Sequence, residues 1–274
     1  MRSDGPVVVN QVKRTRAATQ GVAGVLALLG AVLSAQAASE PVQVASHAMV
    51  RLPVSSATVH LQRVEVAANG ALLVPASVTD LHIEELVLAD GARLGAVASE
   101  HPLNVHIGQA RIGDQVRIGA QGAPGTYSKP ATAGRDLNLR LNQVELGSLV
   151  VDVRGGRGAP GYKGLDGANG KSGGCTWGRS QKGEPGQDGT DGHAGAPGGR
   201  VVLEVPAALD LARVQVLASG GVGGEPGAAG QGGLGGKGKG CLVYRVSGAS
   251  DGAAGVAGQP GSQGPDGRVE VRRL

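Results

Sequence analysis

Three histidines recur at one position of an internal repeat and could together ligate a metal ion. They are His60, His82 and His106, each the second residue of an alternating apolar pattern. If the repeats stack as neighbouring strands, the imidazoles lie about 4.8 Å apart, and Glu84 is near enough to complete a Zn²⁺ site. Alternation equally places this position on a solvent-facing polar row. Since no closely spaced Cys and His motif supports a metal, we expect the polar row and no cofactor.

A second set of residues combines aromatic rings with cations in two segments, 174–182 and 237–247. They hold the chain's only Trp, one of its three Tyr, five basic residues and no acid. Such a set suits stacking on a sugar or contact with an anionic polymer. The alternative is that the rings cover a disulfide while the charges keep the segments soluble. The candidate binding residues are Trp177, Arg179, Lys182, Lys237, Lys239, Tyr244 and Arg245.

Motifs for catalysis are missing from the sequence. It contains no Gly-x-Ser-x-Gly, no phosphate-binding loop and no His-Glu-x-x-His segment. A polysaccharide-cleaving enzyme would need acidic residues gathered on one sheet face, whereas Glu65, Glu84, Glu85 and Glu145 are scattered. We therefore expect no enzyme, and a lyase or hydrolase acting on polysaccharides is the alternative.

The histidines belong to a pattern, apolar-x-apolar-x-x-apolar-x-apolar, that occurs five times. Its copies begin at Val59, Leu81, Val105, Leu139 and Leu209. Alternation predicts half-buried strands. With the glycine-rich segments 119–133 and 155–199 looped out, each repeat measures about 20 to 25 residues, a suitable turn for a parallel β-helix. An antiparallel β-sandwich is the alternative, but the even spacing of a whole pattern favours the solenoid, whose handedness the sequence leaves open.

Four later blocks place glycine at every third residue. They span 158–173, 183–198, 224–236 and 252–267. This period predicts polyproline-II or polyglycine-II helices, in which only Gly fits where backbones touch. The phase slips between blocks, so a continuous three-chain collagen rod cannot run through them. We expect two out-and-back hairpins within one chain, and hence a monomer in preference to a homotrimer.

The glycine triplets, such as Gly-Glu-Pro at 183–185, Gly-Ala-Pro at 195–197 and Gly-Pro-Asp at 264–266, resemble those of bacterial collagen-like proteins. That resemblance implies a secreted or surface protein with a structural or adhesive role, usually trimeric. Gly-Gly steps, as at 223–224, depart from the collagen pattern. They look more like the polyglycine-II bundles of some bacteriophage tail-fibre adhesins, which implies tip loops that bind a host surface.

The N-terminus has the features of a secretory signal peptide. Basic residues at 13–16 precede an apolar run at 22–33 and an Ala-Gln-Ala cleavage site at 35–37. The run is short for a membrane span, and an uncleaved anchor is the alternative. Removing 1–37 lowers the net charge from +4 to about +1, so nucleic-acid binding loses its main support. We expect a secreted or cell-surface protein, with the periplasm as the other compartment.

In an exported chain, two cysteines favour a disulfide. Cys175 and Cys241 fall at the turns of the two expected hairpins, so we predict that they bond and clamp the hairpins side by side. Free or intermolecular cysteines are the alternative. The predicted organisation is a signal peptide at 1–37, β-solenoid coils at 38–154, and collagen-like hairpins interleaved with the remaining strands at 155–274.

Together these features predict an all-β fold, a small parallel β-helix (solenoid) from which glycine-rich polyproline-II or polyglycine-II hairpins project. We expect a non-enzymatic structural or adhesive protein whose hairpin tips contact a cell-surface or matrix polymer, with glycans among the candidates. Nucleic acid is not an expected partner, and the mature chain is expected to have no membrane span.

Overall fold

The computed structural model describes residues 41–176 and 178–274. The chain divides into two units, Met1–Ala37 and Ala38–Leu274, and all the described strands lie in the second. The predicted signal peptide at 1–37 lies outside the described residues.

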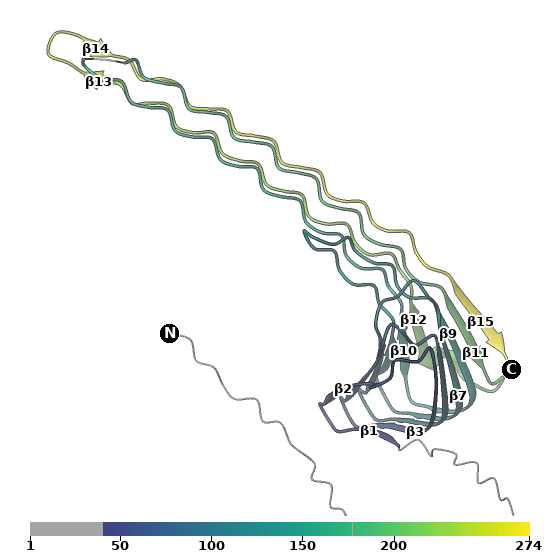
Figure 1. Ribbon diagram of the computed structural model, residues 1–274. Coiled ribbons are helices and arrows are strands. Elements are labelled where there is room, and N and C mark those ends of the chain that lie inside the picture. Colours follow the sequence, from purple (N-terminus) through teal and green to yellow (C-terminus); the bar gives the residue numbers. More distant parts are fainter. Residues whose placement is uncertain (1–40, 177) are drawn as a thin grey trace, which may run out of the picture. The chain divides into compact units, whose positions relative to one another are not determined.

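Two large parallel sheets contain most of the strands, and successive strands alternate between them (Figure 1). The seven-stranded sheet has, in spatial order, β1 (Val42–Val44), β3 (Thr58–Val66), β5 (Asp80–Leu88), β7 (Leu103–Ile112), β9 (Leu137–Leu146), β11 (Val201–Val205) and β15 (Val269–Arg273). The six-stranded sheet has β12 (Val214–Leu217), β10 (Leu149–Asp152), β8 (Val116–Gly119), β6 (Arg93–Ala96), β4 (Ala71–Val74) and β2 (Met49–Arg51). A 3-10 helix, η1 (Leu211–Arg213), is the one helix of the described residues, and β13 (Lys239–Gly240) pairs with β14 (Arg245–Val246) in an antiparallel ribbon.

The predicted fold class was wrong. In place of a small all-β solenoid with glycine-rich hairpins, the structure has two large sheets of seven and six strands. All pairing within these two sheets is parallel, the pattern otherwise typical of α/β proteins, with almost no helix here. Both sheets continue with strands that lie after residue 154. The reason is that β11, β12 and β15 return to the open strand edges, where unpaired backbone groups gain partners.

The first four copies of the sequence pattern lie side by side in the seven-stranded sheet. Val59 pairs with Leu81, Leu81 with Val105, and Val105 with Leu139. The fifth predicted copy, which begins at Leu209, was misplaced, because that segment forms η1 and β12 of the other sheet. Instead β11 supplies the next strand beside β9, and it places Glu204 opposite Arg140.

The core consists almost wholly of aliphatic side chains between the two sheets. Leu81 and Leu86 of β5 are fully buried, and so are Val116 and Val151 of the six-stranded sheet. Burial of one such side chain stabilises the fold by about 1.5–3 kcal/mol. Rows of Val, Leu and Ile therefore provide the apolar core that the scarce aromatic residues do not.

One arginine is buried against this core. The side chain of Arg135 has no solvent exposure, and burial lowers the pKa of its guanidinium. The group donates hydrogen bonds to backbone carbonyls of the loops around it, at 2.8 Å to His101 and also to Val78, Val97 and Pro102. Arg135 thus ties together loops that precede β5 and β7.

Four glycine-rich segments, which we call arms A (155–173), B (181–199), C (219–238) and D (248–268), run side by side between the sheets and the β13–β14 ribbon (Figure 1). They contain no helix or strand. Their backbones hydrogen-bond to one another at every third residue. Gln187 of arm B donates to Leu165 of arm A at 2.8 Å, and Gly230 of arm C donates to Gln187 at 2.9 Å. Gly255 of arm D donates to Gly230, also at 2.9 Å, so one network joins all four arms.

Acidic side chains satisfy backbone donors that this network leaves over. Asp188 accepts from the amide of Val256 at 2.7 Å, and Asp191 accepts from that of Gln259 at 2.6 Å. These carboxylates lie on arm B and the amides on arm D. Asp188 and Asp191 therefore hold arms B and D together.

Candidate functional site

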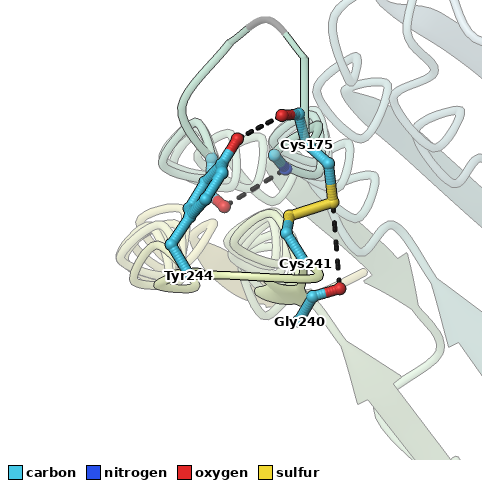
Figure 2. The surroundings of a disulfide bond; sticks show 6 residues. Cys175, Gly240, Cys241 and Tyr244 are labelled. Carbon is cyan, nitrogen blue, oxygen red and sulfur yellow. Dashed lines mark hydrogen bonds between the residues drawn. A yellow bond between two sulfur atoms is a disulfide. The ribbon is translucent and has the colours of Figure 1, made fainter.

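The two cysteines lie where the arms end and are joined by a disulfide. The Cys175 and Cys241 sulfurs are 2.00 Å apart, and the Cα atoms are 5.7 Å apart. Figure 2 shows this bond linking the turn between arms A and B to the turn between arms C and D. This pairing confirms the predicted disulfide. We call residues 174–182 and 237–247 the tip.

Tyr244 adds a second link across the tip. Its hydroxyl donates a hydrogen bond to the backbone carbonyl of Cys175 (Figure 2). Its own carbonyl accepts from the amide of Cys241 at 2.8 Å and closes a turn that contains Leu242 and Val243. Tyr244 is still about half exposed, at 51%. The side chain of Tyr244 therefore links the two turns beside the disulfide and remains half exposed.

The predicted cations of the tip are all exposed: Arg179, Lys182, Lys237, Lys239 and Arg245. Within residues 41–176 and 178–274, none of them takes part in an ion pair. Trp177, the other predicted aromatic residue of the tip, lies outside the described residues. The structure thus places every described member of the predicted set on one disulfide-linked tip.

Two tip residues that the sequence interpretation missed are the most exposed apolar side chains there. Leu242 is 103% exposed and Val243 is 89% exposed. The signal was present in the sequence, because an aliphatic pair is unusual in a turn, where Gly, Pro, Asn, Asp and Ser dominate.

The histidine row forms a stack on the seven-stranded sheet and not a metal site. The ring centroids of His60 and His82 are 4.5 Å apart and those of His82 and His106 are 4.9 Å apart, with nearly parallel planes. An imidazole nitrogen binds a metal in the plane of its ring, and nearly parallel planes that are stacked on one another do not meet at one ion. In the part of the chain that is described, no group of His, Cys, Asp or Glu suits a metal. The ring geometry therefore does not support the alternative of a zinc site with Glu84, and the three histidines lie in one polar row along the sheet.

Desolvation, followed by the charges of the neighbouring imidazoles, lowers the pKa of His82 below its ordinary value of 6.5. Along the same row the sheet continues with Arg140, Glu204 and Arg272. Glu204 lies 3.5 Å from each of these two guanidiniums.

Beside this row an amide ladder crosses the strands. Asn104 donates to Asp80 at 2.8 Å, and Asn138 donates to Asn104 at 2.7 Å. The ladder stops at Val202, which has no polar group to continue it. A groove of about 350 Å³ lies there. Its polar lining includes Asn104, His106, Asn138, Arg140, Glu204 and Arg272.

No family model, no curated protein and no solved structure matches this chain. Among the described residues, no helix is long and apolar enough to cross a membrane. The functional interpretation therefore depends on the geometry of the tip and of the two sheets.

Proposed function

We propose that this chain is a non-enzymatic, exported structural protein that adheres to a cell surface or extracellular matrix through its tip. The observation that carries the proposal is the composition of the tip. Five exposed cations, one half-exposed tyrosine and two exposed aliphatic residues occur together, and no acid lies among them. An uncompensated cationic surface attracts anionic partners over about a Debye length, roughly 8 Å in physiological salt.

The arms support this proposal because the hydrogen bonds between them hold the tip in a fixed conformation. Their backbone amides are bonded between arms at every third residue, and the disulfide joins the two turns. A binding surface that is already ordered loses little conformational entropy on contact. The bonds lie within one chain, which favours a monomer.

Charge reversal at the tip tests the proposal. In the double variant Lys239→Glu and Arg245→Glu, we expect cell binding of the labelled protein to fall at least about tenfold, as expected when two surface contacts are lost. The matched control is Lys129→Glu with Arg93→Glu, which makes the same charge change at exposed residues away from the tip. Equal cell binding by the two double variants would contradict the proposal.

A polysaccharide lyase or hydrolase remains the second candidate. The acid that lines the groove, Glu204, is paired with Arg140 and Arg272. Hydrogen bonds from Arg272 and Arg200, which also line the groove, lower the pKa of Glu270. A lowered pKa does not favour proton donation near neutral pH. Incubation with polysaccharides separates the two candidates, because the enzyme would release reducing ends and the adhesive protein would not.

A further inference from the structure

The tip turn exposes two aliphatic side chains that nothing else in the described chain covers. The β13–β14 ribbon pairs Gly240 with Arg245, and the Cys241–Tyr244 hydrogen bond closes the turn between them. Leu242 and Val243 occupy its two central positions and are almost fully exposed. Polar side chains at these two positions would expose less apolar surface to water, and the turn would keep its hydrogen bonds. Two aliphatic residues in an exposed turn, with no packing partner in the described chain, point to a contact with another molecule.

We propose that the tip docks on the surface of a lipid bilayer with anionic headgroups. Leu242 and Val243 enter the boundary between headgroups and acyl chains, and the surrounding cations contact the headgroup phosphates. The inference rests on the proposed adhesive function and names the partner of the same site.

Charge complementarity favours a membrane as the occupant. Lys239 and Arg245 flank the aliphatic pair on both sides of the turn. Three further cations of the tip are exposed and are not ion-paired among the described residues. Stable peripheral attachment needs two signals, an inserted apolar group and a polybasic surface, and the tip supplies both. A glycan would be bound by ring stacking and hydrogen bonds, and neither interaction would involve Leu242 or Val243.

Two bonds to Cys175 fix the turn that would enter the bilayer surface. The disulfide fixes Cys241 to Cys175, and the Tyr244 hydroxyl bonds to the carbonyl of Cys175 (Figure 2). The half-exposed Tyr244 ring lies next to the aliphatic pair in the chain, and tyrosine is enriched at the level of lipid headgroups. Two links to Cys175 thus hold the turn that carries the exposed apolar residues.

Vesicle binding by the full chain tests the inference. We would measure co-flotation with vesicles of phosphatidylcholine alone and of phosphatidylcholine mixed with phosphatidylglycerol. Binding is expected only to the mixed vesicles and should weaken as salt is raised. The variant Leu242→Ser with Val243→Ser should bind at least roughly tenfold less, because both inserted side chains are lost. The matched control is Leu234→Ser with Val256→Ser, whose side chains are 61% and 67% exposed on the arms, and it should bind like the wild type.

Failure of this inference can be told apart from failure of the proposed function. Absence of binding to phosphatidylglycerol vesicles, or equal binding by the two serine variants, would overturn the membrane partner. If the Lys239→Glu and Arg245→Glu variant still loses cell binding in that case, tip adhesion stands and a surface polymer such as a glycan is the partner. Circular dichroism and mass mapping of the disulfide would show that each variant retains its fold and its Cys175–Cys241 bond.

Discussion

The α-carbon of Gly230 lies directly against the backbone of Leu165, so that a Cβ at Gly230 would sit 2.0 Å from the Leu165 carbonyl oxygen. The contact joins arm C to arm A, and the two residues are 65 positions apart along the chain. A shift of the Gly230 backbone would break hydrogen bonds, because Gly230 donates to Gln187 and accepts from Gly255. Glycine at every third residue is thus required by contacts between arms of one chain.

Gly230→Ala should therefore destabilise the arms. We expect a lower melting temperature and a loss of about 1–3 kcal/mol, the usual cost of overpacking. The control is Gly240→Ala, since a Cβ at Gly240 meets nothing within 4 Å. Thermal unfolding followed by circular dichroism measures both, and similar melting temperatures for the two variants would refute the packing of the arms.

After reduction of the disulfide, we expect the hydrogen bonds between the arms to open more readily near the tip than near the sheets. The bond spans a sequence separation of 66 residues, and the chain-entropy model gives about 4 kcal/mol for a loop of this length. Hydrogen exchange should show the amide of Gly236, near the tip, losing protection after reduction. The amide of Gly221, near the sheets, should keep its protection. Uniform loss at both amides would mean that the arms do not unfold from the tip.

The stability of the protein should depend on pH through His82. The pKa of His82 is lowered in the folded chain, from 6.5, so the unfolded chain binds the proton more readily in this range. Stability from the neutral imidazole is therefore complete above about pH 6.5 and is lost as pH falls toward the lower folded pKa. Melting temperature measured against pH should be less steep below 6.5 for His82→Gln than for the wild type. His193→Gln, at an exposed residue of arm B, is the control and should follow the wild type.

Replacement of Arg135 should be costly because of its buried hydrogen bonds. Arg135→Met keeps much of the volume but leaves the carbonyls of Val78, Val97, His101 and Pro102 without this donor. We expect a loss of about 3 kcal/mol or more, seen in urea unfolding. Arg111→Met is the control, because Arg111 forms only an exposed ion pair with Glu145 at 3.7 Å, worth under about 1 kcal/mol. Equal stability of the two variants would contradict a structural role for Arg135.

The positions of individual residues could be predicted from the sequence more accurately than the fold. The side-by-side positions of Val59, Leu81 and Val105 follow from alternation and spacing, which depend only on local strand geometry. The Cys175–Cys241 bond follows from the positions of the two cysteines at the turns between glycine blocks. The extent of the sheets does not, because pairing of β15 with β11 joins strands separated by two glycine-rich arms. No local pattern records which open edge a returning strand will choose.

The same limit applies to the candidate site. The cations of the tip could be found from charge and composition, since exposed turns gather such residues. Leu242 and Val243 could not be found in the same way, because neither side chain is aromatic or charged. The histidines were correctly placed on one row, but a repeat register does not tell whether rings converge or stack, and His60, His82 and His106 stack.

Sedimentation equilibrium combined with circular dichroism tests most directly whether the glycine-rich arms fold on one another within a single polypeptide. The account predicts the mass of one chain and a melting temperature that is independent of protein concentration. A homotrimer with a collagen-type spectrum, whose melting temperature rises with concentration, would contradict it.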